Sequence, residues 1–168
     1  MKIYLFVILL FSVAMSCKHK NNVIGDITSH RNIDQTTAAK SEKAALQPLD
    51  SLKNDVGKKL KANDLFKKYG IQSRLKKMLG KDFKNFEEGW GEESPLKKEL
   101  ELLYATSCKK DNCSSLKILL IIDILTNNLN VYIFQYGTIK TYEEYTIIGL
   151  TDSLGTIFEK MRDAQSSH

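Results

Sequence analysis

Two cysteines with four residues between them are the part of the sequence best suited to chemistry. Cys108 and Cys113 enclose polar and charged residues in "SCKKDNCSS", residues 107–115, and a strongly apolar run follows at once. Such a pair serves as a disulfide, as two ligands of a metal site or as a redox centre. The cellular compartment decides much of this choice, because disulfides persist in oxidising environments.

The N-terminal residues indicate export and a lipid anchor. Lys2 precedes an almost wholly apolar stretch, residues 3–15, which is too short for the roughly 20 residues of a membrane-spanning helix. The following segment, Ala14-Met15-Ser16-Cys17, resembles the lipobox of bacterial lipoproteins, in which the chain is cut before a cysteine that then carries acyl chains such as palmitate. We therefore expect a signal peptide over residues 1–16 and lipidation of Cys17. The alternative is an ordinary secretory signal with a chance cysteine.

In an exported protein the two remaining cysteines favour a disulfide. The bond would close a ring of six residues and contribute roughly 2 kcal/mol, so it shapes a loop more than it holds the fold. A zinc site needs two further ligands, and the histidines lie in the tails, at His19, His30 and His168. Redox centres usually have two residues between their cysteines. We expect a disulfide between Cys108 and Cys113, and neither a metal nor a cofactor.

Composition divides the rest of the chain into a tether and one domain. Residues 17–45 begin with the lipidated cysteine and continue as a segment rich in Asn, Ser, Thr, Lys and Ala, which predicts a disordered tether. Residues 46–168 are enough for a single core and predict one α+β domain. Apolar residues at three- and four-residue spacing predict helices over 46–60 and over 65–79, the second capped by Asp64 and ended by Gly80.

The second half of the domain predicts strands. Phe83 and Phe86 indicate one more helical turn, and "EEGWGEESP" then breaks the helical pattern. Runs rich in Ile, Leu, Val and Tyr, separated by turn signals, predict strands at 100–107, 116–125, 129–136 and 139–148. A last helix begins at Asp152 or Ser153. The predicted fold is α+β, with N-terminal helices packed on an antiparallel sheet of three to four strands and a C-terminal helix.

Charge and residue types argue against nucleic-acid binding and against catalysis. Residues 53–84 hold eleven Lys or Arg against three Asp; we interpret them as solvated helix faces rather than a surface for lipopolysaccharide, acidic glycans or nucleic acid. Between residues 46 and 167 there is no histidine, which excludes Ser–His, Cys–His and His-based metal chemistry there. We interpret the carboxylates as surface groups: Glu87, Glu88, Glu92, Glu93, Asp111 and Asp123. The sequence does not predict an enzyme.

The ring and the two strands after it resemble the inhibitor-of-vertebrate-lysozyme (Ivy) family, small exported proteins of Gram-negative bacteria. In that family a disulfide-closed loop, typically Cys-Lys-Pro-His-Asp-Cys, projects into the active site of lysozyme. The present ring, Cys108-Lys109-Lys110-Asp111-Asn112-Cys113, has the same size, both cysteines and the first lysine. Three further stretches resemble small bacterial lipoproteins with such loops: "WGEESP" at 90–95, "IIDILTNNLNVYI" at 121–133 and "IKTYEE" at 139–144.

The ring differs from the family's pattern at its tip. Lys110 stands where the family has proline, Asp111 where it has histidine, and Ser114 where a glycine follows the second cysteine. The resemblance implies that the histidine lies against the catalytic carboxylates of lysozyme. Asp111 would meet them as a like charge, whereas Lys109 and Lys110 would offer cations.

Two functions are therefore expected for a protein of the bacterial envelope. The first is inhibition of a lysozyme or another peptidoglycan hydrolase, with Lys109, Lys110, Asp111 and Asn112 as the binding loop. The alternative is an interaction module of unknown partner that uses Trp90, Glu92 and Glu93, although a lone tryptophan is more often a core residue. The lipid on Cys17 would bind the membrane, and the absence of acidic residues at 18–20 favours an outer-membrane anchor that faces the periplasm.

Overall fold

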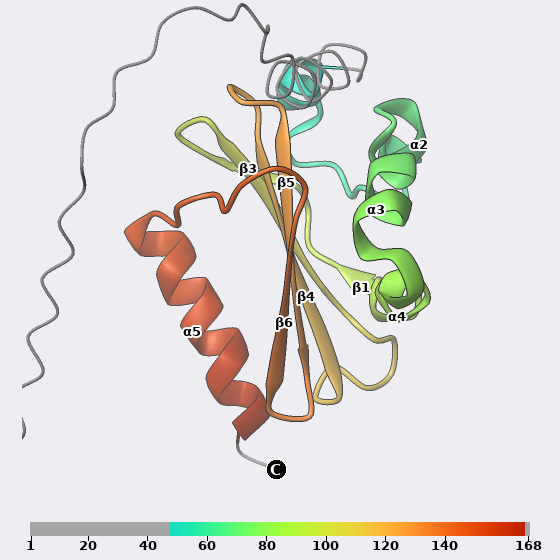
Figure 1. Cartoon of the computed structure of the whole chain (residues 1–168), viewed down its shortest axis with the longest axis vertical. Coiled ribbons are helices and arrows are strands. Elements are labelled where there is room, and N and C mark those ends of the chain that lie inside the picture. Colours follow the sequence, from blue (N-terminus) through green and yellow to red (C-terminus); the bar gives the residue numbers. More distant parts are fainter. Residues whose placement is uncertain (1–47, 167–168) are drawn as a thin grey trace, which may run out of the picture.

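The computed structural model describes residues 48–166, and Figure 1 shows their arrangement. The predicted signal peptide, the lipidation of Cys17 and the tether lie outside the described residues. The first half is helical: η1 (Asp50–Asp55), α2 (Leu65–Lys68), α3 (Ile71–Leu79), η2 (Gly80–Asp82) and α4 (Phe83–Gly89). The second half holds β1 (Glu92–Glu93), β2 (Lys97–Glu99), β3 (Leu102–Cys108), β4 (Leu116–Asp123), β5 (Asn128–Gln135), β6 (Thr138–Glu143) and α5 (Asp152–Ser166).

The sheet is the middle of three layers. Its strands are antiparallel in the order β1-β3-β4-β5-β6. Strands β1 and β2 share one edge of β3, since β1 pairs with its last residues and β2 with its first. Helices α2 to α4, called the helical layer below, cover one face, and α5 covers the other (Figure 1). The predicted α+β class, with N-terminal helices, an antiparallel sheet and a C-terminal helix, is confirmed.

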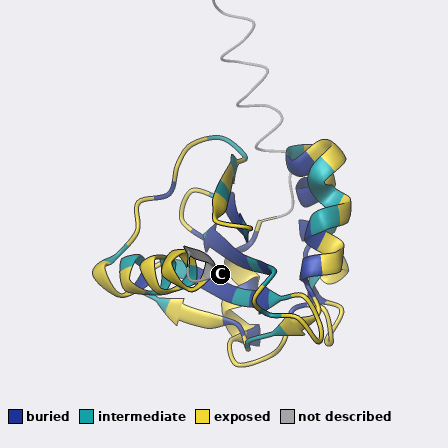
Figure 2. Cartoon of the chain, turned by 90° about the horizontal axis from the view of Figure 1, so that it is seen from below, coloured by how far each residue is buried: buried dark blue, intermediate teal, exposed yellow. Residues whose placement is uncertain are grey.

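Strands β4 and β5 are buried on both faces, which explains their nearly continuous apolar sequence. Because successive side chains of a strand point to opposite faces, Ile118, Leu120 and Ile122 join the core beneath the helical layer. Leu119 and Ile121 join a second core beneath α5. Figure 2 shows buried segments of the sheet in dark blue between α5 and the helical layer.

The strand register places the cysteine ring at one end of the sheet. Cys108 pairs with Lys117 and Leu102 pairs with Asp123, so residues 109–115 join β3 to β4 at what we call the ring end. The β5–β6 turn lies at the same end, since Leu116 pairs with Gln135. The turns at 100–101 and 124–127 lie at the opposite end, which we call the far end.

The helical predictions for the first half need correction. The helix predicted over 46–60 is only the 3₁₀ helix η1, and residues 46 and 47 lie outside the described part. Backbone hydrogen bonds from Gly57 N to Leu96 O and from Leu96 N to Lys58 O, both 2.8 Å, fasten this segment to the chain before β2 instead. Tertiary contacts here override local periodicity.

The helix predicted over 65–79 is in fact two helices. Gly70 has a φ of 66° and separates α2 from α3. Asp64 precedes α2, but its side chain makes no capping hydrogen bond. Gly80, with a φ of 52°, ends α3 as predicted, because glycine adopts positive φ without a steric penalty.

The sheet has six strands rather than the three or four predicted. The four long strands β3 to β6 form the predicted meander. The two additional strands, β1 and β2, have two and three residues and flank Pro95 on the outer edge of β3. Segments this short show no detectable periodicity, and the glycines and proline beside them predict a break. In residues 48–166 no helix is long and apolar enough to cross a membrane.

Candidate functional site

The cysteine ring is closed and projects from the ring end of the sheet. Cys108 and Cys113 form the predicted disulfide, with their Cα atoms 4.9 Å apart. The four residues between them, Lys109 to Asn112, are all exposed. β3 leads into the ring and β4 leads out of it, and both strands belong to the buried centre of the sheet. The ring is therefore a short exposed loop on a rigid base.

Hydrogen bonds within the ring fix its shape. Lys109 N donates to Leu116 O at 3.0 Å, and Asn112 N donates to Lys109 O at 3.1 Å, which closes a turn. Ser114 Oγ donates to Asn112 Oδ1 at 2.9 Å. Asp111 has a φ of 61°, in the left-handed region that Asp and Asn tolerate better than most residues. The tip thus has a defined backbone conformation in addition to the disulfide.

Gly91 lets the chain before β1 pack directly against the ring. Its backbone nitrogen donates to Cys108 O at 3.1 Å. A Cβ atom at position 91 would lie 2.5 Å from Lys110 N and 2.9 Å from Lys110 Cβ, closer than real Cβ contacts. Only glycine fits at this close approach of two backbones.

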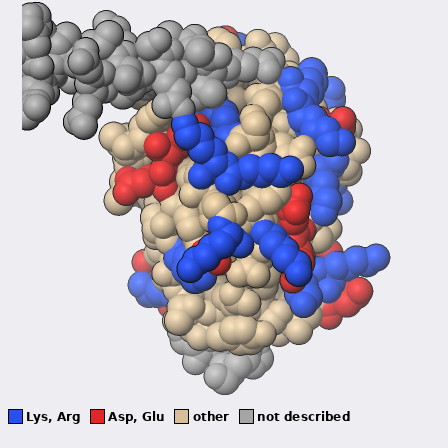
Figure 3. Space-filling view, turned by 45° about the vertical axis from the view of Figure 1, so that its right-hand side comes forward, with Lys and Arg blue, Asp and Glu red and all other residues tan. Residues whose placement is uncertain are grey.

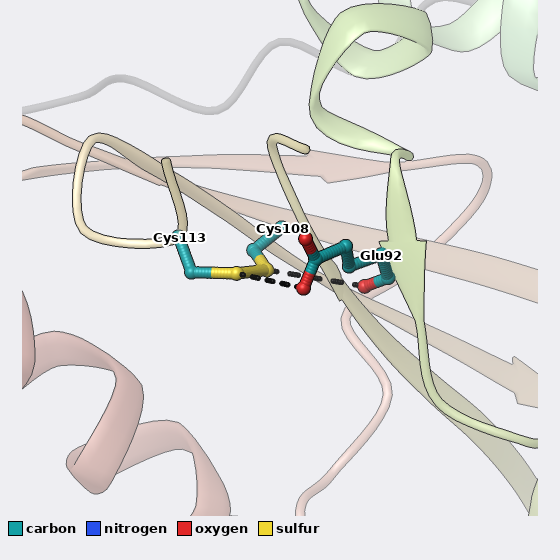
Figure 4. A group of neighbouring side chains, drawn as sticks. All are labelled: Glu92, Cys108 and Cys113. Atoms are coloured by element: carbon teal, nitrogen blue, oxygen red, sulfur yellow. Dashed lines mark hydrogen bonds between the residues drawn. A yellow bond between two sulfur atoms is a disulfide. The ribbon is translucent and has the colours of Figure 1, made fainter. Parts of the chain in front are cut away.

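Glu92 supports the ring from the same side (Figure 4). Its carboxylate accepts a hydrogen bond from Asp111 N at 3.4 Å and lies 3.7 Å from Cys113 Sγ. Its backbone oxygen accepts a hydrogen bond from Ser107 Oγ at 3.0 Å. Among the described residues, Glu92 and the two cysteines form the group closest to metal-ligand geometry. The two sulfurs are bonded to each other, so they offer no thiolate to a metal.

Trp90 is a core residue, which is the role that sequence analysis favoured over partner binding. It is 1% exposed and packs against the rings of Phe66 and Phe86, with centroids 5.1 and 5.0 Å away. Trp90 Nε1 donates to Glu93 Oε2 at 2.7 Å. Glu93 also accepts hydrogen bonds from the backbone nitrogens of residues 61 and 62, at 3.0 and 2.9 Å. Both side chains serve the packing of β1 on the helical layer.

The basic segment is spread over the helical layer, where Figure 3 shows Lys and Arg side chains on the surface. Several of these lysines pair with nearby acids: Lys53 with Asp50, Lys58 and Lys68 with Asp55, and Lys67 with Asp64. This pairing agrees with the interpretation of solvated helix faces. The lysines of the ring, Lys109 and Lys110, lie elsewhere, at the ring end.

Two features beside the ring were not predicted from sequence. Tyr136, in the β5–β6 turn, is 77% exposed at the ring end. A hollow of about 310 Å³ lies between the ring and α5, and its walls include the disulfide together with Ile157 and Met161. The pairing of Leu116 with Gln135 brings Tyr136 to this end. The predicted antiparallel strands already imply that position, but residue type alone gives no reason to single out Tyr136 as a site residue.

A family model described as inhibitor of vertebrate lysozyme (Ivy) matches residues 70–162, more than half of the chain. The chain belongs to the Ivy family. The match extends from Gly70, just before α3, into α5, and it includes the ring, Gly91 and Glu92. No curated protein and no solved structure matches the chain. Membership confirms the resemblance of the cysteine ring, and a family of inhibitors is consistent with the prediction that the chain is not an enzyme.

Proposed function

We propose that this Ivy-family protein inhibits a lysozyme, or another peptidoglycan hydrolase, by inserting its cysteine ring into the active-site cleft of that enzyme. The observation that carries the proposal is the ring itself: four exposed residues, closed by a disulfide and supported by Gly91 and Glu92. Family membership supports the same function.

The ring has the rigidity expected of a loop that inserts into an enzyme cleft. A loop that is already ordered loses little conformational entropy on binding, so more of the contact energy appears as affinity. The disulfide, the turn between Lys109 and Asn112 and the contact of Glu92 with Asp111 N all order the ring before it meets a partner. The ring lies at an end of the sheet, where a protruding loop can enter a cleft.

The chemistry of the tip suits a cleft lined by carboxylates. Glycoside hydrolases such as lysozyme cleave sugars with a pair of carboxyl groups. The ammonium groups of Lys109 and Lys110 would form charge-assisted hydrogen bonds with that pair. Asp111 would repel it, so we assign recognition to the lysines and expect Asp111 to limit affinity.

Anchoring belongs to the same proposal. A signal peptide over residues 1–16 and acyl chains on Cys17 would hold the protein in the bacterial envelope, in the outer membrane facing the periplasm. Several acyl chains on one residue bind a bilayer firmly, because each buried CH₂ contributes about 0.8 kcal/mol. The inhibitor would then stand between the membrane and the peptidoglycan that it protects.

An inhibition panel tests the proposal. A soluble form that begins at Lys18 is added to lysozymes of the chicken, goose and invertebrate types, and hydrolysis of peptidoglycan is measured against inhibitor concentration. We expect inhibition of at least one type that competes with substrate, because the plug occupies the cleft. If a saturating concentration of the protein leaves hydrolysis by all three lysozymes unaffected, inhibition of lysozyme is contradicted.

The alternative, an interaction module that uses Trp90, Glu92 and Glu93, has less support. Trp90 is buried, and the carboxylates of Glu92 and Glu93 face the ring and the helical layer rather than solvent alone. The binding roles of these three residues remain a prediction. Binding of a partner that survives Lys109→Ala/Lys110→Ala but is lost in Glu92→Ala/Glu93→Ala would favour the module.

A further inference from the structure

The far end of the sheet carries three large apolar side chains that are mostly exposed in the described structure. Leu100 is 74% exposed, Leu125 is 75% exposed and Ile147 is 64% exposed. They lie in three different connections, which are the β2–β3 turn, the β4–β5 turn and the loop between β6 and α5. None of these three residues belongs to either core, and side chains this exposed gain little stability from burial within the fold.

Hydrogen bonds fix these connections in place, so the apolar side chains lie at one end of the molecule. Ile124 N donates to Glu101 O at 3.2 Å, which joins the turns of Leu100 and Leu125. Asn128 Nδ2 donates to Thr146 O at 2.8 Å and holds the loop of Ile147 against the start of β5. Leu100 also has a φ of 52°, a conformation in which Gly or Asn costs less than leucine. The turn geometry therefore does not account for leucine at this position.

The described chain also begins at the far end. Leu49 N donates to Asn127 Oδ1 in the β4–β5 turn at 3.3 Å. Residues 18–47 lie between this point and Cys17. The lipid proposed for Cys17 would thus be attached through a segment that joins the domain beside Leu125. The ring lies across the length of β4, eight residues or about 25 Å away.

We propose that the far end docks on the lipid bilayer, with Leu100, Leu125 and Ile147 inserted among the headgroups, so that the ring points away from the membrane. This inference goes beyond the inhibitory function and rests on the proposed lipid anchor. The tether predicted for this segment would not orient the domain by itself, because 30 residues of flexible chain would have a root-mean-square length of about 30 Å, enough to let either end face the membrane. Insertion of the three apolar side chains into the bilayer would fix the orientation of the domain relative to the membrane.

Lipid fits this surface better than a second protein does. A stable protein interface buries about 800 Å² on each partner, and three separate side chains on turn tips do not provide a continuous area of that size. Single apolar side chains on protruding turns insert between lipid headgroups, where each gains from burial without the need for a complementary surface.

Lipid quenching of an introduced tryptophan tests the orientation. The full chain, purified from a bacterial host, is reconstituted into phosphatidylcholine vesicles with or without brominated acyl chains. Leu125→Trp reports on the far end, and Tyr136→Trp is the matched control, since both residues are highly exposed turn positions at opposite ends. The buried Trp90 gives the same background in both variants.

We expect brominated lipid to reduce the added fluorescence of Leu125→Trp about twofold and to leave that of Tyr136→Trp nearly unchanged. Equal quenching at both positions, or no quenching at position 125, would overturn the docking. So would a soluble form from Lys18 that dimerises in sedimentation and is made monomeric by Leu100→Ser/Leu125→Ser/Ile147→Ser, because a second copy would then cover the far end.

A flotation assay distinguishes an error in the proposed lipid anchor from an error in the proposed docking of the far end. If the full chain does not float with vesicles, lipidation at Cys17 is wrong. The quenching is then measured on a chain with a hexahistidine segment before Lys18. A nickel-chelating lipid binds this segment and attaches the chain to the vesicle in place of the acyl chains. Preferential quenching of Leu125→Trp in that arrangement supports the docking, and its absence contradicts it.

Discussion

Gly91 and Lys110 pack so closely that a Cβ atom at position 91 would lie 2.5 Å from the Lys110 backbone nitrogen. Lys110 follows Gly91 by nineteen positions, and strands β1, β2 and β3 lie between them in the sequence. This contact links the segment before β1 to the tip that we propose as the inhibitor.

Replacing Gly91 should therefore disturb the ring without unfolding the protein. We expect Gly91→Ala to weaken inhibition at least about tenfold, since a displaced tip loses its fit to the cleft. Gly149→Ala is the matched control, because nothing lies within 4 Å of a Cβ there. The inhibition constant and the melting temperature of both variants are compared. Full potency in Gly91→Ala would show that the position of the ring does not matter.

The lysines of the tip should carry the recognition of carboxylates. We expect Lys109→Ala/Lys110→Ala to weaken inhibition at least about tenfold, or about 1.4 kcal/mol, by removing charge-assisted hydrogen bonds. The melting temperature should not change, because both side chains are exposed. Lys97→Ala/Lys98→Ala removes an adjacent exposed pair from β2 and should leave potency intact. Equal losses in the two variants would indicate a general effect of net charge instead of a specific tip.

Asp111 should oppose binding. We expect Asp111→Asn to strengthen inhibition about fivefold, since removing one like charge at a partly solvated contact is worth about 1 kcal/mol. Asn also tolerates the positive φ at this position, so the ring should keep its shape. The gain should shrink as salt is added, because salt screens the repulsion. Weaker inhibition in Asp111→Asn would mean that the aspartate binds a donor of the target enzyme.

Asp55 should make stability depend on pH. Hydrogen bonds from Lys58, then from Lys68 and Tyr69, hold the pKa of its carboxyl well below the usual value. A depressed folded-state pKa stabilises the protein above the unfolded pKa of about 4, and this contribution is lost as pH falls further. We expect Asp55→Asn to lower the melting temperature at pH 7, with a difference from the wild type that narrows as pH falls below about 4. Asp50→Asn removes an exposed ion pair with Lys53 and should have a smaller effect at pH 7. A difference for Asp55→Asn that does not change with pH would contradict the assignment.

The parts of the fold that sequence could predict are those with long periodic or apolar runs. β4 and β5 are recognisable because both faces are buried, and α5 because its apolar residues recur at helical spacing. The helix predicted over 46–60 is too long, because hydrogen bonds of Gly57 and Lys58 with Leu96, almost 40 positions away, decide the course of this segment. No local pattern contains that information.

The candidate site also has a part that the sequence predicts and a part that it does not. The type and spacing of the two cysteines, together with the predicted export, are enough to predict the disulfide. The binding role of the lysines between them rests on the resemblance to the Ivy family. The support from Gly91 and Glu92 was not, because it depends on the pairing of Glu92 with Cys108 in a strand of only two residues. The "WGEESP" segment was noted for its resemblance to other lipoproteins. In the structure, Trp90 and Glu93 hydrogen-bond to each other beneath the helical layer, and Gly91 and Glu92 contact the ring.

The most direct measurement compares the wild type with Cys108→Ser/Cys113→Ser in the lysozyme panel. The double variant opens the ring without a reductant, which would also attack the disulfides of lysozyme itself. The account predicts a folded protein with inhibition at least about tenfold weaker, because the open loop must be ordered on binding. Undiminished inhibition by the double variant would contradict the insertion of a closed ring into the cleft.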